Sequence, residues 1–292
     1  MEKIIVIGGP TASGKSKFAL NLAQEFPSVI INADSQQVYA ELPIISAQPT
    51  LSEQKIVPHK LYGFLKASEV CSVGVWIEAA KKEIDKALSE DKTPILVGGT
   101  GMYIKCLTEG MAEIPDIDED LREETRALLE EIGNEEFHKI LAEKDPETAT
   151  RLEVGDSQRM VRAMEVIAQT GISISEFQKQ PNKTFYPKED FKKIFINPDR
   201  EKLYANCNAR FSKMLEEGAL DEIAKFAKLN LSPELPSMKA LGVPELLAHI
   251  NGDISLEEAT EKASGSTRRY AKRQLTWFRN QFEADEIIEN TL

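Results

Sequence analysis

The sequence has few of the residues that build disulfide frameworks and transition-metal sites. Its 292 residues include three cysteines and three histidines. The cysteines are Cys71, Cys106 and Cys207, and the histidines are His59, His138 and His249. They are widely spaced and form no C-x-x-C pair, which argues against a disulfide framework or a zinc site and for a reducing compartment. We therefore expect a cytoplasmic protein without a cluster of metal-binding cysteines and histidines.

Long apolar runs and an excess of positive charge are also missing. No stretch of eighteen apolar residues is present, so the sequence predicts no membrane span. The N-terminal apolar run, IIVI at 4–7, stops at glycines and is too short for a signal peptide. The net charge of −12 argues mildly against binding to nucleic acid, although an average can hide local basic patches.

Short apolar runs alternate with helical patterns along the rest of the chain. The runs are at 4–7, 29–32, 95–98 and 194–197, and helical patterns include 15–26 and 74–90. Strands that alternate with helices are typical of an α/β fold with a parallel sheet and helices on both faces.

An acidic region interrupts this alternation. Residues 116–147 contain thirteen acidic and four basic side chains and no run typical of a strand. We interpret residues 114–180 as a helical insertion domain, and residues 1–113 and 181–292 as the catalytic core.

The clearest motif is GPTASGKS at 9–16, which fits G-x-x-x-x-G-K-[ST] between a predicted strand and a predicted helix. Such a P-loop binds phosphates through backbone N–H groups and the helix N-terminus. Its residues are Gly9, Pro10, Thr11, Ala12, Ser13, Gly14, Lys15 and Ser16. Lys15 would reach a terminal phosphate and the Ser16 hydroxyl would bind Mg²⁺. The motif predicts a polyphosphate ligand, without saying which one.

Two other predicted strands end at polar residues that could face the P-loop. One runs into Asp34 and the other into Thr100. In a parallel sheet both ends lie at the same edge, where ligands bind. Asp34 could be a magnesium ligand, a general base or the N-cap of a following helix. Thr100 by itself is a weak signal.

Several segments together resemble the bacterial tRNA dimethylallyltransferase (tRNA isopentenyltransferase) family. The first three are VIGGPTASGKS, INADSQQVY and PILVGGTGMYI, in that order. Later ones are GDSQRMVRAMEVIAQTG, NARFSKMLEEG, LPSMKALG and AKRQLTWFR. The resemblance extends from residue 4 to about residue 280 and implies a P-loop NTPase-like core.

The resemblance implies a reaction and roles for the site residues. The family transfers a dimethylallyl group from dimethylallyl diphosphate to N6 of the adenosine 3′ to the anticodon, so the P-loop would hold the leaving pyrophosphate. Asp34 would accept the proton of the attacking amine, Thr100 would lie by the reacting centre, and Arg210 would contact the donor's phosphates. Mg²⁺, bound with the help of Ser16, is the expected cofactor.

The family pattern also implies a contact surface for the tRNA anticodon stem-loop. Its expected residues are Asp34, Ser35, Gln36, Gln37, Thr100, Arg122, Gln158, Arg159, Met160, Val161, Arg162, Lys239, Arg268, Lys272 and Arg273. At 100° per residue, the five cations of 268–279 share an arc of about 140°, apart from an apolar arc that contains Leu275 and Phe278. This basic helix face allows a protein of net negative charge to bind RNA, because its cations release counterions from RNA phosphates.

Two positions depart from the family pattern, and other functions stay open. The departures are the segment 58–64 and Val243. The alternatives are a P-loop kinase of small metabolites, a nucleotide-gated RNA-binding protein and an enzyme that prenylates free AMP. The insertion and the basic helix favour tRNA, and we expect a monomer without an obligate protein partner.

Overall fold

The computed structural model describes residues 3–289 and divides into two compact units. Unit 1 comprises Met1–Thr108 and Phe185–Leu292, and unit 2 is Glu109–Thr184. Unit 1 contains β1 (Ile4–Gly8), α1 (Lys15–Leu22), β2 (Ser28–Asn32), α2 (Leu51–Ile56), β3 (His59–Lys60), α3 (Val73–Ser89), β4 (Thr93–Gly98) and α4 (Gly101–Glu109). After unit 2 it continues with β5 (Phe191–Ile196), α9 (Arg200–Glu216), α10 (Ala219–Ala227), α11 (Val243–Ile250), α12 (Leu256–Gln281) and β6 (Glu286–Ile288).

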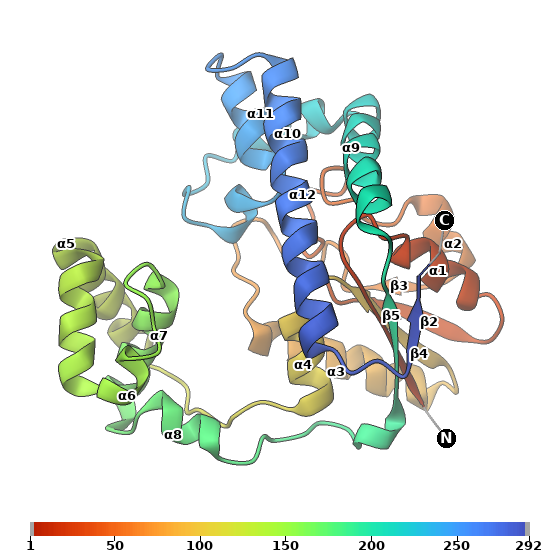
Figure 1. Cartoon of the computed structure of the whole chain (residues 1–292). Helices are drawn as coiled ribbons and strands as arrows, with labels where there is room; N and C mark the ends of the chain where they lie inside the picture. Colours follow the sequence, from red (N-terminus) through yellow and green to blue (C-terminus); the bar gives the residue numbers. More distant parts are fainter. Residues whose placement is uncertain (1–2, 290–292) are drawn as a thin grey trace. The chain divides into compact units, whose positions relative to one another are not determined.

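The six strands form one sheet in the order β3-β2-β4-β1-β5-β6, and all paired strands are parallel (Figure 1). The predicted α/β class is therefore confirmed. The predicted strands are all present, and the fourth begins earlier than expected, at Phe191. The strands β3 and β6 at the two edges were not predicted.

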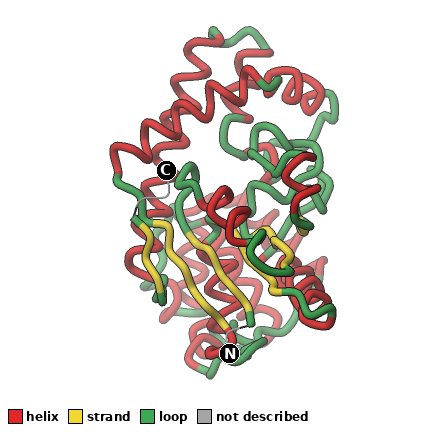
Figure 2. Tube along the Cα trace, turned by 90° about the vertical axis from the view of Figure 1, so that its right-hand side faces the viewer, coloured by secondary structure: helices red, strands yellow, loops and turns green. Residues whose placement is uncertain are grey.

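Both faces of the sheet are covered, as its nearly continuous apolar strands require. On one face, Ile7 and Val97 pack with Ala19 of α1. On the other face, Phe278 of α12 packs so closely on β1 that a Cβ at Gly8 would lie 2.4 Å from its ring. Figure 2 shows the strands of the sheet side by side, with helices around them.

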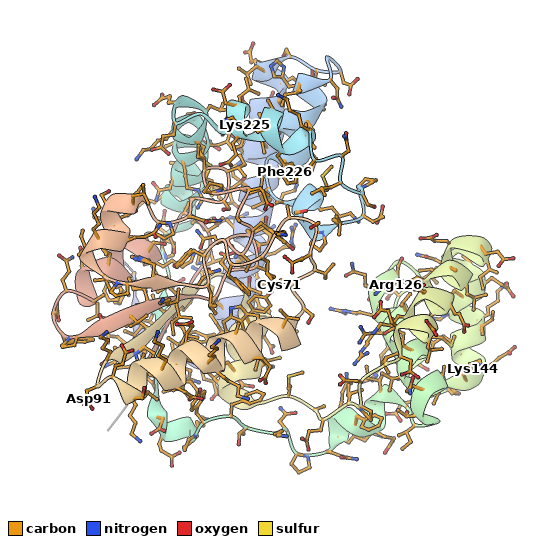
Figure 3. All side chains as sticks on the ribbon, turned by 180° about the vertical axis from the view of Figure 1, so that it is seen from behind. Cys71, Asp91, Arg126, Lys144, Lys225 and Phe226 are labelled. Carbon is orange, nitrogen blue, oxygen red and sulfur yellow. The ribbon has the colours of Figure 1, made fainter. Side chains whose placement is uncertain are left out.

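A second apolar core of unit 1 lies among α9, α10, α11 and α12. It includes Phe211, Phe226 and Val243, each at most 3% exposed. Phe226 and its exposed neighbour Lys225 are labelled on α10 in Figure 3. Val243, one of the departures from the family pattern, is therefore a core residue at the start of α11.

Unit 2 is helical and has its own core. Its helices are α5 (Glu119–Lys144), α6 (Pro146–Ala149), α7 (Ser157–Thr170) and α8 (Ile174–Lys179). The helix α5 is broken at Gly133, whose φ of 74° is left-handed. The core contains Phe137, Leu141 and Met160, while Arg126 and Lys144, labelled in Figure 3, are exposed.

Candidate active site

The P-loop connects β1 to α1 at the carboxyl end of the central strand. Two of its residues have left-handed backbone, Ala12 with φ 60° and Gly14 with φ 86°, and Lys15 begins the helix. Gly9 has no room for a side chain, since a Cβ there would lie 2.8 Å from the Ile196 carbonyl oxygen. The loop therefore brings a helix N-terminus and a tight backbone turn together, which is the arrangement that binds phosphates.

Two cations meet at this loop, buried Lys15 and half-buried Arg210. Lys15 is 7% exposed, and its Nζ donates to the Pro10 carbonyl oxygen at 3.2 Å. Arg210, on α9, donates to Thr11 Oγ1. Burial lowers the pKa of Lys15 to about 8, with Asp34 opposing the shift and Arg210 adding to it. Burial likewise lowers the pKa of Arg210. Cations that have lost their hydration favour a polyanionic ligand, whose charge would compensate them.

A cavity of about 240 Å³ opens beside the P-loop. Its polar and ionisable lining is Thr11, Ser13, Lys15, Ser16, Lys17, Asp34, Gln36, Gln37, Ser46, Cys207, Arg210, Thr267 and Tyr270. Its apolar lining includes Ile45, Ala47, Phe211, Met214, Ala240 and Leu241. The cavity thus combines a phosphate-binding loop with apolar walls, which suits a ligand that is part polyanion and part hydrocarbon.

Asp34 is buried in this cavity and follows β2. Its Oδ1 accepts from the Gln36 N–H at 3.0 Å, and its own N–H donates to Asn32 Oδ1 at 2.9 Å. Residues 35–37 form a turn, and the next helix, α2, begins only at Leu51. The interpretation of Asp34 as the N-cap of an adjacent helix is therefore wrong: its carboxylate closes a turn and lines the cavity.

Thr100 is half-buried and bonded to Ser35, the residue after Asp34. Its Oγ1 accepts from the Ser35 N–H at 2.8 Å and donates to Ser35 Oγ at 3.1 Å. Neither residue belongs to the cavity lining. The structure thus brings Lys15, Asp34 and Arg210 around one cavity, whose lining does not include Thr100.

The two glutamines after Asp34 brace neighbouring loops. Gln36 Oε1 accepts from the Leu241 N–H at 3.1 Å. Gln37 Nε2 donates to the Ser46 and Ala47 carbonyl oxygens, at 3.0 and 2.6 Å. Both side chains therefore help to shape the cavity that they line.

Sequence reasoning missed two residues of α12 that reach this site. Gln274 Oε1 accepts from the Thr11 N–H, and its Nε2 donates to the Gly99 carbonyl oxygen, both at 2.8 Å. Tyr270, one turn earlier, lines the cavity. Both lie on α12, in which helix periodicity distinguishes only a basic and an apolar arc. They lie more than 250 residues from the P-loop in the sequence, so the sequence pattern gives no sign of the contact.

A second cavity, of about 260 Å³, shares Ser16, Gln37 and Arg210 with the first. His59 and Tyr62 line it. The segment 58–64, which departs from the family pattern, therefore forms part of the wall behind the P-loop.

The predicted basic face of α12 is exposed over most of its length. Arg269, Lys272, Arg273 and Arg279 are exposed, whereas Arg268 is half-buried and donates to Asn208 Oδ1. Arg269, Lys272 and Arg273 also border an open apolar hollow at Trp277. Elsewhere in unit 1, exposed Lys239 pairs with Glu234 at 2.7 Å.

In unit 2 the predicted RNA contacts divide into exposed and buried ones. Gln158 and Arg159 are exposed, and Arg162 pairs with Glu165 at 3.4 Å. Arg122 pairs with Glu119 at 3.1 Å.

Met160 and Val161, which belong to the same predicted tRNA-contact segment, have buried side chains in the structure. They are 0% and 9% exposed and pack in the apolar core of unit 2. The polar positions of α7 point outward while these two point inward, because a helix turns by about 100° per residue.

The sheet, the P-loop and the cavity at the carboxyl edge define a P-loop protein of the α/β class. A family model described as IPP transferase matches residues 37–281. The chain is 47% identical over 277 residues to a tRNA dimethylallyltransferase of Nitrobacter hamburgensis, a match that covers 95% of this chain and 87% of that protein.

Two solved structures are similar as well. The full-length tRNA isopentenylpyrophosphate transferase of Bacillus halodurans is 32% identical, with a TM-score of 0.68 over 99% of this chain and 90% of that one. A eukaryotic dimethylallyltransferase acting on tRNA is 30% identical, with a TM-score of 0.83 over 95% of this chain and 70% of that one. The chain belongs to the tRNA dimethylallyltransferase (IPP transferase) family, and the predicted resemblance is confirmed.

Proposed function

We propose that the chain transfers a dimethylallyl group from dimethylallyl diphosphate to N6 of the adenosine 3′-adjacent to the anticodon of tRNA and releases pyrophosphate. The observation that carries this proposal is the cavity in which Lys15, Arg210 and the P-loop lie beside Asp34 and a set of apolar walls. A prenyl diphosphate uses both parts of this cavity, because it joins a polyanion to a hydrocarbon.

In this proposal, residues 9–16 and Arg210 bind the diphosphate of the donor. As the carbon–oxygen bond breaks, its electron pair leaves with pyrophosphate. The N–H groups of the loop, Lys15 and Arg210 stabilise the negative charge that develops there. The dimethylallyl group lies against the apolar lining that includes Phe211 and Met214.

The residues present also fit Mg²⁺. Ser16 presents a hydroxyl at the first turn of α1 and lines the cavity beside the loop. Oxygen ligands of this kind, together with phosphate oxygens, are those that Mg²⁺ prefers. When bound, the ion neutralises part of the charge on the diphosphate.

Asp34 acts on the nucleophile. The amine of adenine is a weak nucleophile because its lone pair is delocalised into the ring. Asp34 accepts an N6 proton as the nitrogen–carbon bond forms, which restores the electron density that the bond needs. The base must leave the stack to reach a buried carboxylate. Thr100 supports this centre through its bonds to Ser35, the residue after Asp34.

The tRNA is held by two surfaces on the two units. The surface on unit 1 consists of Ser35, Gln36, Gln37, Lys239, Arg268, Lys272 and Arg273. The surface on unit 2 belongs to the insertion 114–180 and consists of Arg122, Gln158, Arg159 and Arg162. The exposed cations of α12 support the first surface, since they can replace counterions on phosphates. We also propose that the protein acts as a monomer without an obligate protein partner.

Nucleoside analysis tests the proposal directly. Unmodified tRNA is incubated with the protein, Mg²⁺ and dimethylallyl diphosphate, and pyrophosphate is measured in parallel; separate reactions contain AMP in place of tRNA, or ATP in place of the prenyl donor. We expect N6-dimethylallyladenosine in the tRNA and an equal amount of pyrophosphate. Modified AMP without modified tRNA would assign the mononucleotide as the acceptor, and ATP-dependent phosphorylation without prenyl transfer would make the protein a kinase.

A further inference from the structure

Glu222 is a buried carboxylate to which the proposed mechanism assigns no role. It lies in the first turn of α10, is 8% exposed and does not belong to the lining of the cavity beside the P-loop. A buried carboxylate is costly unless its oxygens are hydrogen-bonded. The groups that bond to it therefore indicate what its charge acts on.

Both oxygens of Glu222 accept from one loop, far away in the sequence. Oε2 accepts from the Ile44 N–H at 2.8 Å and Oε1 from the Ile45 N–H at 2.9 Å. Burial raises the pKa of Glu222, and the two N–H groups oppose that shift by stabilising the charged form. Because the two N–H groups are consecutive in the chain, the carboxylate fixes both the position and the orientation of this backbone.

The following residues of the loop are held from a second side. Gln37 Nε2 donates to the Ser46 and Ala47 carbonyl oxygens. Ala47 has a φ of 54°, in the left-handed region that a residue other than glycine adopts only where its surroundings impose it. The loop 44–47 is thus held at its N–H groups by Glu222 and at its carbonyl groups by Gln37.

This loop supplies apolar side chains to the site. Ile45 and Ala47 line the cavity beside the P-loop, and Ile44 and Ala47 line the second cavity. A Cβ at Gly242 would lie 2.9 Å from Ile45 Cδ1 and 2.9 Å from Phe211 Cε2. The side chains of Ile45 and Phe211 therefore both lie against Gly242, and both form part of the apolar lining of the first cavity.

We propose that Glu222 is a positioning residue: by holding the Ile44 and Ile45 N–H groups, it fixes the Ile45 side chain in the apolar wall that receives the hydrocarbon of the prenyl diphosphate. The proposal rests on the proposed function, in which the dimethylallyl group lies against this lining. Glu222 acts on the hydrocarbon end of the donor and not on its diphosphate, because Thr11 of the P-loop is held by other bonds, from Gln274 and Arg210.

Two ligands that share a polyanion test this role. Dimethylallyl diphosphate and inorganic pyrophosphate both carry the diphosphate, and only the first carries a hydrocarbon. The dissociation constant of each is measured by isothermal titration in the presence of Mg²⁺ and without tRNA, on variants that circular dichroism shows to be folded.

The variants are Glu222→Gln and Ile45→Val, with Asp221→Asn as the matched control. Gln keeps the size of the side chain but has one acceptor oxygen, so its NH₂ group faces one of the two N–H groups of the loop. Asp221 is exposed and lies in the same first turn of α10. Its replacement by Asn removes the same charge from the helix N-terminus and leaves the bonds of Glu222 in place.

We expect Glu222→Gln to raise the dissociation constant of dimethylallyl diphosphate about tenfold, as lost apolar contact of one to two methylene groups predicts, and that of pyrophosphate less than twofold. Ile45→Val removes one methylene group from the wall itself and should raise the dissociation constant of dimethylallyl diphosphate about fourfold, again with little change for pyrophosphate. Asp221→Asn should match the wild type with both ligands.

The positioning role would be overturned by an equal change for the two ligands, by no change for either, or by the same effect in Asp221→Asn. A Glu222→Gln chain that does not fold would also overturn it, since Glu222 would then serve stability alone. So would an Ile45→Val variant that binds both ligands like the wild type. Failure of the proposed function would look different, because the wild type would then make no prenylated tRNA.

Discussion

Gln274 and Thr11 are 263 residues apart in the sequence and hydrogen-bonded in the structure, with 2.8 Å between the Thr11 nitrogen and Gln274 Oε1. The same side chain donates to the Gly99 carbonyl oxygen. One amide group thus joins α12 to the P-loop and to the loop after β4. The helix that presents exposed cations to solvent is therefore fixed to the phosphate-binding loop.

The first prediction follows from this pair. Gln274→Leu keeps a side chain of similar size but leaves the Thr11 N–H and the Gly99 carbonyl without that partner in a buried place. Each such group costs about 1–3 kcal/mol, so for the two groups we expect the free energy of unfolding to fall by about 2–6 kcal/mol. Urea denaturation followed by circular dichroism measures this change.

Gln24→Leu is the matched control for this experiment. Gln24 is exposed just after α1, and its Nε2 donates to the Leu20 carbonyl oxygen of that helix at 3.0 Å. The control should change the free energy of unfolding by no more than about 0.5 kcal/mol, as surface substitutions usually do. Equal stability of the two variants would mean that the Gln274 bonds contribute nothing to folding.

The second prediction concerns Lys15 in the P-loop. Lys15→Ala removes a buried cation that faces the proposed diphosphate, so turnover should nearly stop and the donor should bind more weakly. Binding of tRNA should stay close to the wild-type value. Isothermal titration with donor and filter binding with tRNA separate the two effects, and loss of tRNA affinity with unchanged donor affinity would contradict the assignment.

The third prediction is a pH dependence set by the same residue. Burial holds the pKa of Lys15 at about 8 in the free protein, below its ordinary value of 10.5. Lys15 is therefore charged below pH 8 and loses its charge as the pH rises through that value. Because kcat/KM reports the free enzyme, kcat/KM for the donor should fall above pH 8.

Lys15→Arg is the control for the pH profile. A guanidinium keeps its charge to higher pH than an ammonium group. When kcat/KM of this variant is plotted relative to its own maximum, the decline above pH 8 should be absent, whatever the absolute rate. A decline that persists unchanged would assign it to another group.

How much of this site was predictable depends on how far apart its parts lie in the sequence. Lys15 and Asp34 follow directly after strands, so strand ends and the P-loop motif place them at one sheet edge. Gln274 and Tyr270 were missed because the site that they reach is formed by segments far away in the sequence. Helix periodicity says which residues share a face of α12 but not what that face contacts.

The buried side chains of α7 and the edge strands illustrate two further limits. Met160 and Val161 lie within a predicted contact segment, yet the helix directs them into the core of unit 2. The strand β3 has two residues and β6 has three, which is too short for a periodic pattern to be seen. Their pairing is decided by neighbouring strands rather than by local sequence.

The fourth prediction concerns the exposed cations of α12. Removing Lys272 and Arg273 together should weaken tRNA binding and flatten the dependence of log K on log salt by about two units, one for each phosphate contact. Arg268 is half-buried and bonded to Asn208, so adding Arg268→Ala should bring the total change to at most about three units.

Lys81→Ala with Lys92→Ala is the matched control for charge. Both lysines belong to surface ion pairs, with Glu78 and Glu90. This variant should leave the salt dependence of tRNA binding unchanged. The same slope in both double variants would mean that the face of α12 is only a solvated surface.

The last prediction separates three roles of Asp34. Asp34→Asn keeps an oxygen that can accept from the Gln36 N–H, so the turn at 34–37 and the fold should survive. It removes the charge and the basicity that the attacking amine needs in the transition state. We expect kcat to fall by about 10²–10⁴-fold, the usual range for a positioned acid or base, with little change in either KM.

The readouts for Asp34→Asn are kcat, both KM values, the Mg²⁺ dependence and the unfolding midpoint. A metal ligand would show weaker Mg²⁺ affinity and recovery of activity in excess metal, because the vacated coordination position can be filled by mass action. A structural aspartate would show a lower unfolding midpoint that accounts for the lost activity. A base shows neither change, since its contribution arises only as the nitrogen–carbon bond forms and the amine gives up its proton.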